Sequence, residues 1–296
     1  MVADPPHRSG AVAIVGRPSV GKSTLINRLV RQKLSITSKK PQTTRHRING
    51  ILTEDARQFV FVDTPGFQTR QSSLLNERMN RLVRSALADV DAVVWVVDAR
   101  RIVAADRDAL SLVPADVPTI AALNKVDALA DKALLLPRID EVAKLRHFAA
   151  IVPISAERDL QIDRLKDAIA AVLPEAPAMY PHDQITDRDE RFIAAEFVRE
   201  KIFRSIGDEV PYSTAVTIDR FEEVGSLRRI FASVLVDKPG QRAILLGHRG
   251  ERMKAIASAA RVDLERALGG TVHLEVWVRV RKGWADEARS LTRLGY

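Results

Sequence analysis

The sequence contains no cysteine among its 296 residues. This absence excludes a disulfide framework, a thiol nucleophile and a cysteine-based zinc site, and it suits a reducing cytosol. Long apolar runs are also lacking, because stretches such as AVVWVV fall well short of the roughly 18 residues that a membrane span needs. The N-terminal stretch MVADPPHRSG lacks the apolar segment of a secretory signal. We therefore expect a soluble, cytoplasmic protein.

Positive charge is concentrated towards one end of the chain. The formal net charge is +8, and the residues from Gly225 to Tyr296 contain 14 Lys/Arg against 7 Asp/Glu, a net +7 that leaves +1 for the preceding 224 residues. A basic end on a near-neutral body is typical of proteins that bind a polyanion, either nucleic acid or an acidic membrane surface. Solvated surface charge would give the same count, so charge alone leaves both interpretations open.

The first half of the chain alternates strand-like and helical patterns. Its strand candidates, AVAIVG, QFVFVD, DAVVWVVDA, PTIAALNK and AIVPISA, are mostly apolar throughout, as in parallel strands buried on both faces. Helical spacing between them, as in SLLNERMNRLVRSALADV, predicts a doubly wound, mostly parallel α/β sheet over residues 10–175, after a flexible N-terminus at 1–9. The proline-rich, charged segment 176–189 predicts a linker.

Residues 190–296 predict a smaller α+β domain. A helix over ERFIAAEFVREKIFRSI is followed by two strands, STAVTIDRFEEV and LRRIFASVLVDK. A glycine-containing loop then leads into a second helix, and TVHLEVWVRVRK reads as a closing strand. The predicted order is therefore helix–strand–strand–helix–strand.

A phosphate-binding P-loop is predicted near the N-terminus, where GRPSVGKS at 16–23 matches G-x-x-x-x-G-K-[ST] between a strand and a helix. Its glycines allow backbone N–H groups to curl around phosphates, and the helix N-terminus adds positive potential. We expect Lys22 to reach the β- and γ-phosphates and Ser23 to ligate Mg²⁺. The predicted nucleotide contacts in this segment are Gly16, Arg17, Pro18, Ser19, Val20, Gly21, Lys22, Ser23 and Thr24.

Two further segments predict that the base is guanine. N-K-V-D at 124–127 follows an apolar strand, and its aspartate carboxylate can accept from guanine N1–H and N2–H₂, whereas adenine would leave it unpaired. The asparagine is expected at the N7 edge of guanine and the lysine stem over the ring. Ser-Ala at 155–156 ends the next strand, and the backbone N–H of Ala156 is expected to face guanine O6. Taken alone, this short pattern favours a plain loop. The predicted base contacts are Asn124, Lys125, Asp127, Ser155 and Ala156.

The stretch FVDTPGF at 61–67 predicts the hydrolytic switch. Asp-Thr-Pro-Gly at the end of an apolar run looks like the magnesium and γ-phosphate contact of a GTP-hydrolysing switch. The best-known GTPases carry glutamine after this glycine to orient the attacking water, but here Phe67 has no polar atom, and Gln68 is shifted by one residue, which re-aims its side chain. Because P-loop catalysis depends mainly on phosphate positioning and charge neutralisation, we expect a working but slow GTPase.

A candidate RNA-binding loop lies in the basic end. Residues 247–250 form a G-x-x-G pattern at the predicted start of a helix, with basic residues on both sides. In KH domains such a loop clamps the backbone of about four single-stranded nucleotides. Taken alone the pattern favours a helix-start turn, and the basic surroundings and the element order add weight to RNA binding. The predicted RNA contacts are Arg242, Gly247, His248, Arg249, Gly250, Arg252 and Lys254.

In combination, these motifs resemble the Era family of GTPases. The P-loop, DTPG and NKVD motifs follow one another as in translation-factor-related GTPases, and SITSKKPQTTRHRINGI is similar to the switch I segment of Era. The element order of residues 190–296 resembles a type II KH domain, and the tail LERALGGTVHLEVWVRVRKGWADEARSLTRLGY is similar to the Era C-terminus. The resemblance thus runs from about Gly10 to Tyr296.

The resemblance implies cofactors and catalytic residues. GTP or GDP and Mg²⁺ would be bound, with Thr44 closing on Mg²⁺ and the γ-phosphate, although the adjacent Thr43 is an open alternative. The catalytic set would be Lys22, Thr44 and Gly66, and the metal would be held by Ser23, Thr44 and, through a water, Asp63. Relatives carry asparagine where Ser19 stands, and that asparagine helps to hold a monovalent cation, so the shorter serine argues against K⁺ stimulation.

The resemblance also implies a biological role and partners. The family grips the 3′ end region of small-subunit (16S-type) rRNA and acts, under GTP control, in assembly of the 30S-type subunit; we expect a monomer. The charged strand VWVRVRK, with Trp277 and Trp284, leaves open a peripheral contact with anionic lipid at the inner face of the cell membrane. Three other functions stay open: a signalling GTPase without RNA, an RNA-binding scaffold without turnover, and a potassium-activated tRNA-modification GTPase, which should not carry the KH-like tail.

Overall fold

The structure is a computed structural model that describes residues 7–38, 40, 43–65, 74–207, 210–285, 287, 291–292 and 294. The chain forms two compact units. The first comprises the described residues within 1–35, 44–70 and 79–187, and the second those within 36–43, 71–78 and 188–296. The predicted domain bounds at 10–175, 176–189 and 190–296 stay a prediction.

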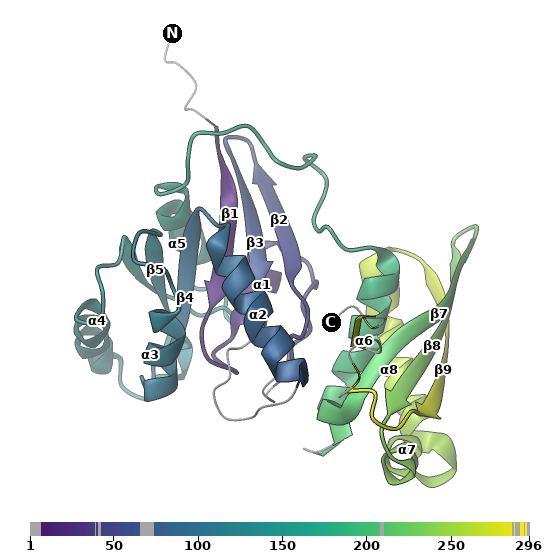
Figure 1. The fold of residues 1–296 in the computed structure, drawn as a ribbon. Coiled ribbons are helices and arrows are strands. Elements are labelled where there is room, and N and C mark those ends of the chain that lie inside the picture. Colours follow the sequence, from purple (N-terminus) through teal and green to yellow (C-terminus); the bar gives the residue numbers. More distant parts are fainter. Residues whose placement is uncertain are drawn as a thin grey trace. The chain divides into compact units, whose positions relative to one another are not determined.

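The first unit is built on a six-stranded sheet with the order β2-β3-β1-β4-β5-β6 (Figure 1). Neighbouring strands are parallel except for the pair β2 and β3. The sequence analysis did not predict β2, because the mixed pattern INGILTE lacks the apolar character of the other strands, as its place at the edge of the sheet allows. The strands are β1 (Arg8–Val15), β2 (Ile48–Glu54), β3 (Arg57–Asp63), β4 (Ala92–Asp98), β5 (Thr119–Asn124) and β6 (Ala150–Pro153).

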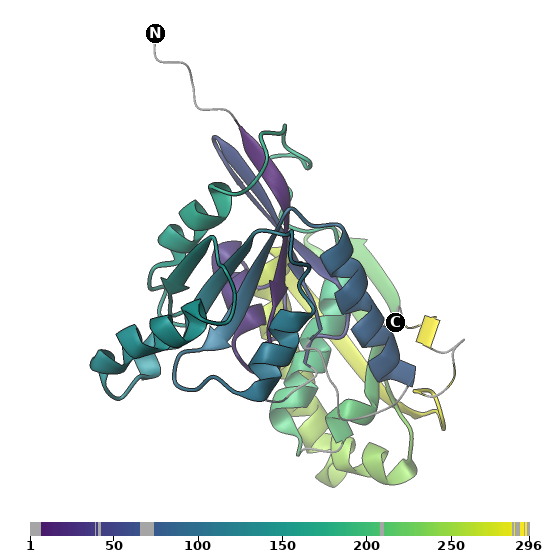
Figure 2. The same cartoon turned by 60° about the vertical axis from the view of Figure 1, so that its left-hand side comes forward.

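Helices cover both faces of this sheet, which explains why its central strands are apolar throughout. Strand β4 contributes Val94 and Val96 to the core beneath α1 and α5, and Trp95 to the core beneath α2, α3 and α4. The predicted doubly wound, mostly parallel arrangement is confirmed, and Figure 2 shows the same layers from a second side. The helices are α1 (Lys22–Leu29), α2 (Leu74–Ala88), α3 (Ala104–Ser111), α4 (Leu135–Ala143) and α5 (Ile162–Ala170), with short 3₁₀ turns at Val126–Ala128 and Lys132–Leu134.

Hydrogen bonds hold the segment predicted as a linker to β2 and β3 of the first unit. The Gln58 Oε1 atom accepts from the backbone N–H groups of Met179 and Tyr180 at 2.6 and 2.9 Å. Further along, the Ile51 N–H donates to the carbonyl of Ile185 at 2.8 Å, so the segment follows β2. The Met179 side chain itself is exposed, so at that residue the main chain makes the contact, whereas the Asp187 side chain accepts from the Asn49 N–H and amide group at 3.2 and 3.0 Å.

The second unit packs helices against a three-stranded sheet with the order β7-β8-β9, in which β7 and β8 are antiparallel and β8 and β9 parallel. The predicted order lacked one helix, α7, because PGQRAILL spans only about two turns and contains glycine. Its start is fixed by the proline in its first turn and by the Gln241 side chain, which accepts from the Lys238 N–H at 3.0 Å. The elements are α6 (Glu190–Ser205), β7 (Thr214–Val224), β8 (Leu227–Val236), α7 (Pro239–Leu246), α8 (Glu251–Leu268) and β9 (Thr271–Val280), with 3₁₀ turns at Val210–Ser213 and His248–Gly250.

The core of the second unit lies between its helices and one face of this sheet. Phe197, Ile202 and Phe203 of α6 are fully buried, so the apolar residues near the end of that helix face the core. Within the described residues, every helix is too short or too polar to traverse a bilayer.

Candidate nucleotide site and RNA-binding loop

The P-loop follows β1 in a backbone conformation that only small residues accommodate. Gly16 and Gly21 have φ angles of +150° and +105°. A Cβ atom on Gly16 would lie 2.4 Å from the Val96 carbonyl oxygen, and one on Gly21 would lie 2.3 Å from Asn124 Nδ2. The two glycines therefore allow the loop to approach both β4 and the end of β5.

Lys22 lies at the first turn of α1 and folds back over this loop. Its Nζ atom donates to the carbonyl oxygens of Gly16 at 2.8 Å and Arg17 at 3.1 Å. Burial lowers the pKa of Lys22 to about 8. The ammonium group is thus held at the mouth of a loop whose N–H groups can bind phosphate.

The three residues predicted to hold Mg²⁺ lie together. Ser23 Oγ is 3.0 Å from Thr44 Oγ1, and each hydroxyl donates to Asp63 Oδ2 at 3.3 Å. Thr43, the alternative, instead donates its hydroxyl to the Lys40 carbonyl at 2.7 Å. The geometry therefore favours Thr44 over Thr43 as a metal ligand.

The environment of the Asp63 carboxylate is suited to binding a cation. It is fully buried, and its Oδ1 atom accepts no hydrogen bond from the described residues. Burial raises the pKa of Asp63 to about 6. Hydroxyl and carboxylate oxygens are the ligands that Mg²⁺ prefers, so the residues present fit this ion.

Asn124 ties together three segments of the site. Its Nδ2 atom donates to the Val20 carbonyl at 2.8 Å, and its Oδ1 atom accepts from the Ala156 N–H at 3.0 Å. The sequence analysis assigned both Asn124 and Ala156 to guanine only. In this structure the asparagine also joins the P-loop to the loop after β6, and the Ala156 N–H is directed at it.

Lys125 is fixed above the P-loop by two partners. It has a φ angle of +67°, and its Nζ atom donates to the Ser19 carbonyl at 2.7 Å and lies 3.1 Å from Asp98 Oδ2. Asp98 in turn receives two hydrogen bonds from the Arg100 guanidinium at 2.9 and 2.7 Å. Asp127 is exposed, with its carboxylate available to a ligand.

A buried ion pair anchors the P-loop to α3, and the sequence analysis missed it. Arg17 Nε lies 2.9 Å from Oδ1 of Asp106, whose side chain is fully buried. The other carboxylate oxygen accepts from the Val103 N–H at 2.9 Å, and the Asp106 carbonyl accepts from the Trp95 indole at 3.1 Å. An acidic residue at the start of a helix was the available signal, but it does not identify a partner 89 residues away.

The remaining predicted residues have simpler placements. Val20 is buried in the core, Ser155 is buried after β6, Thr24 is half-buried on α1, and the Pro18 carbonyl accepts from the Arg17 side chain at 3.4 Å. Ser19 has a φ angle of +65°, which is uncommon for a residue other than glycine. Gly66, Phe67 and Gln68 lie outside the described residues.

The G-x-x-G loop joins α7 to α8. Gly247 and Gly250 have φ angles of +69° and +83°, and Arg249 between them has +48°. A Cβ atom on Gly247 would lie 2.8 Å from the Cβ of Arg252, so the glycine permits a tight turn. At Gly250 nothing lies within 4 Å, which leaves space for a ligand backbone to approach.

Basic side chains surround this loop on the surface. Arg242, His248, Arg249, Arg252 and Lys254 are all exposed. Arg252 also donates to the Ile244 carbonyl at 2.6 Å, which holds its guanidinium beside the loop.

The membrane expectation needs correction at one residue. Trp284 is fully buried, and its indole N–H donates to the Ser213 carbonyl at 3.2 Å, so it cannot lie at a lipid interface. Trp277 is exposed, as that expectation requires.

The fold and the sites define a P-loop GTPase that carries a C-terminal KH domain. A family model described as "50S ribosome-binding GTPase" matches residues 11–125, and a KH domain model matches residues 209–285. "GTPase Era" of Nitrosomonas eutropha is 50% identical over 290 residues, 98% of each chain, and that of Bordetella avium is 51% identical over 289 residues, again 98% of each. The chain belongs to the Era family.

Solved structures agree with this assignment. The crystal structure of a variant of Aquifex aeolicus Era bound to GDP·AlF₄⁻ has a TM-score of 0.94 at 36% identity and covers 98% of this chain and 99% of that one. Era in complex with MgGDPNP and nucleotides 1506–1542 of 16S ribosomal RNA has a TM-score of 0.93 at 35% identity with the same coverage. The predicted family and fold class are confirmed, whereas the roles of individual site residues stay predictions.

Proposed function

We propose that this protein is a GTPase that binds single-stranded small-subunit rRNA near its 3′ end and acts in assembly of the small ribosomal subunit. The nucleotide would be held by the P-loop, by Asn124, Lys125 and Asp127, and by the loop at Ser155 and Ala156. The RNA would be held by the G-x-x-G loop. Support comes from the solved Era complex, whose RNA spans nucleotides 1506–1542 and is therefore much longer than the roughly four nucleotides that one KH loop clamps.

Bound Mg²⁺ would neutralise charge that develops on the transferred phosphoryl group. Ser23 and Thr44 would contribute their hydroxyls to it, and Asp63 would act through a water. Lys22 would bind the β- and γ-phosphates once nucleotide replaces the two carbonyl oxygens that its Nζ atom now contacts. The clustering of these side chains supports the predicted nucleotide site, and Thr44 as the closing threonine.

A single observation carries the proposal that GTP controls the RNA-binding unit. The segment 36–43 lies between α1 and Thr44 in the sequence, yet it belongs to the second unit. There the Thr37 N–H and hydroxyl both donate to Glu200 Oε1, at 3.0 and 3.1 Å, and Arg204 donates to the Thr37 carbonyl at 3.0 Å. Thr44, which would close on the nucleotide, therefore follows in the chain directly after a segment that is hydrogen-bonded to α6. A movement of Thr44 towards the γ-phosphate would pull on that segment and so reach the KH unit through the backbone.

We further propose a slow intrinsic rate, because Phe67 offers no polar atom to the attacking water, and no K⁺ stimulation, because Ser19 has one oxygen on a short side chain. We also propose a monomer, and we propose that it works on the 30S-type subunit in the cytoplasm, as its proposed rRNA partner implies. Lipid contact is the weaker candidate, since one of its two tryptophans is buried.

The test is GTP hydrolysis measured with and without an oligonucleotide that carries the small-subunit rRNA 3′ sequence. We expect slow turnover that the RNA changes, turnover at background in Lys22→Ala, and an RNA effect lost in Gly247→Asp and Gly250→Asp. Turnover equal to that of Lys22→Ala would favour a scaffold without hydrolysis. RNA binding unchanged in both glycine variants would contradict RNA binding by the G-x-x-G loop, and no RNA binding by the wild-type protein would favour a signalling GTPase.

A further inference from the structure

The described helices of the second unit pack on one face of its sheet and leave the other face open. Alternate side chains of β8, such as Ile230 and Val234, point to the helices and are fully buried. The side chains between them point the other way, and strand register sets Arg229 beside His273 and Phe231 beside Glu275 of β9. The G-x-x-G loop follows α7, whose Leu245 packs in the core on the helical side. The loop and the open face are therefore separate surfaces.

An aromatic stack occupies the centre of this face. The rings of Phe231 and Trp277 are nearly parallel, at 12°, with centroids 6.0 Å apart. Arg220 lies over the Phe231 ring at 5.6 Å, and His273 meets it edge-on at 6.3 Å. Trp277 is 43% exposed, so its flat indole is available to a further ring.

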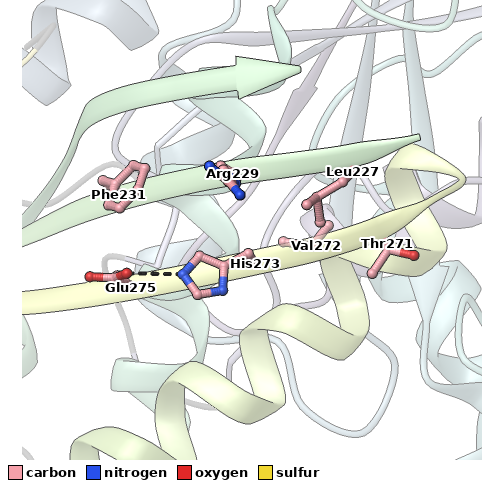
Figure 3. Close-up of a pocket in the computed structure, with 7 residues that line it drawn as sticks. All are labelled: Leu227, Arg229, Phe231, Thr271, Val272, His273 and Glu275. Atoms are coloured by element: carbon pink, nitrogen blue, oxygen red, sulfur yellow. Dashed lines mark hydrogen bonds and ion pairs between the residues drawn. The ribbon is translucent and has the colours of Figure 1, made fainter. Parts of the chain in front are cut away.

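A pocket of about 450 Å³ continues the stack along the two strands (Figure 3). β8 contributes Phe231, Arg229 and Leu227 to one side, while His273 and Glu275 of β9 line the other and contact each other at 2.9 Å. The Arg229 side chain makes no hydrogen bond or ion pair with the described part of the chain. The pocket thus combines aromatic rings, a carboxylate acceptor and an unpaired guanidinium.

These groups match the chemistry of a single-stranded nucleic acid. Bases stack on exposed aromatic side chains, and arginine binds phosphate or stacks on a base. Arg279 is paired with Asp219 at 3.3 Å, in an ion pair whose partners are both well exposed. Exposed pairs of this kind contribute little to stability, so this arginine can exchange its carboxylate for a phosphate at small cost.

We propose that this face, defined by Arg229, Phe231, His273, Trp277 and Arg279, is a second RNA-contact surface that takes unpaired bases of the same RNA strand beyond the G-x-x-G loop. The inference rests on the proposed function, whose RNA is longer than one KH loop can hold. Charged side chains interleave the aromatic ones across the whole face, an arrangement that suits RNA better than hydrocarbon.

The test compares two single-stranded RNAs with the full-length protein. One, of about eight nucleotides, is long enough for the KH loop alone, and the other, of about 37 nucleotides, carries the small-subunit rRNA 3′ sequence. We expect Trp277→Ala and Arg229→Ala each to weaken binding of the long RNA at least about fivefold and to leave the short RNA within about twofold. Arg229→Ala should also reduce the slope of log K against log salt by about 0.7. The matched control is Arg266→Ala, which removes an exposed charge from α8 and should do neither.

Tryptophan fluorescence supplies a readout that a folding defect would not mimic. Trp277 is the exposed member of three tryptophans, because Trp95 and Trp284 are fully buried. The long RNA should quench the wild-type emission. Trp277→Phe should lose that quenching while it retains affinity within about threefold, since phenylalanine also stacks.

The outcomes separate this inference from the proposed function. One outcome would overturn the second surface alone. In it, Gly250→Asp binds the long RNA more weakly, but Trp277→Ala and Arg229→Ala bind it with the same affinity as the control Arg266→Ala. Failure of the wild-type protein to bind either RNA would overturn both. Binding to vesicles of phosphatidylglycerol and phosphatidylcholine that is lost in Trp277→Ala, with RNA binding unchanged, would assign the face to lipid and also overturn the inference.

Discussion

The ion pair between Arg17 and Asp106 gives a direct test of how the P-loop is held in place. Asp106→Asn keeps a side-chain oxygen that can accept from the Val103 N–H, but it removes the charge opposite Arg17. Breaking a buried pair from one side costs about 3–5 kcal/mol, because the remaining charge stays buried without a partner. The Arg17 side chain is 20% exposed, and some rehydration should reduce this cost to about 2–4 kcal/mol.

This loss should be visible in both stability and nucleotide affinity. For a unit of this size it corresponds to a melting temperature lower by roughly 5–15 °C, measured by differential scanning fluorimetry. Because the Arg17 carbonyl also accepts from Lys22, a displaced Arg17 should disturb the phosphate-binding loop. We expect the Kd for a fluorescent GDP analogue to rise at least about tenfold, which is about 1.4 kcal/mol.

Asp108→Asn is the matched control, since it makes the same charge change at an exposed position of the same helix. A double variant, Arg17→Met with Asp106→Leu, should be more stable than the sum of its single changes predicts, because neither charge is then left alone. If Asp106→Asn melts with the wild-type protein and binds GDP equally well, the ion pair does not fix the P-loop and the reasoning is wrong.

Three further predictions concern the same unit. Thr44→Ala should lower GTP turnover at least about tenfold and raise the Mg²⁺ requirement, whereas Thr43→Ala should change both less than about threefold; the reverse order would exchange their roles. Ser19→Asn should make the GTPase rate higher in K⁺ than in Na⁺. If K⁺ stimulates the wild-type protein as much as the variant, Ser19 does not prevent K⁺ stimulation. Burial alone would raise the pKa of Asp98, but hydrogen bonds from Arg100 outweigh it and hold that pKa well below its usual range. Its stabilising effect is therefore present above about pH 4 and lost as pH falls, so the melting-temperature gap between wild type and Asp98→Asn should be widest near pH 7 and narrow below pH 4. A gap independent of pH would exclude this ionic origin.

That the candidate nucleotide-site residues lie together could be predicted from the sequence, because they belong to local patterns at strand ends. Parallel strands present their carboxyl ends at one edge of a sheet, so residues after β1, β3, β5 and β6 had to converge once the order of motifs was recognised. Ser23 and Asp63 are 40 residues apart, yet their side chains lie within 3.3 Å of each other, as that geometry requires.

Ion pairs and hydrogen bonds that belong to no sequence motif could not be predicted. Asp106 is one of two acidic residues in its helix, and only the packing of α3 selects it as the partner of Arg17. Asn124 could be assigned to a base from its motif, but its bonds to Val20 and Ala156 depend on how closely Gly21 lets the P-loop approach β5. The strand β2 and the helix α7 were not predicted for the same reason. Their sequence patterns are mixed or short, and their stability comes from packing against neighbouring elements rather than from their own periodicity.

The placement of segment 36–43 is the clearest example of a feature that could not be predicted from the sequence pattern. Its polar character is typical of a loop, and its position between two nucleotide contacts suggests that it belongs to the nucleotide-binding unit. The structure instead buries Ile36 in the core of the second unit and fastens Thr37 to Glu200, whose side chain is fully buried. Burying a carboxylate is costly unless it receives hydrogen bonds, and at Oε1 the two from Thr37 and the ion pair to Arg204 reduce that cost. These two bonds depend on the position of Thr37, so a movement of Thr44 that displaces the segment would break both of them. The cost of that loss is what would make the KH unit sensitive to the nucleotide.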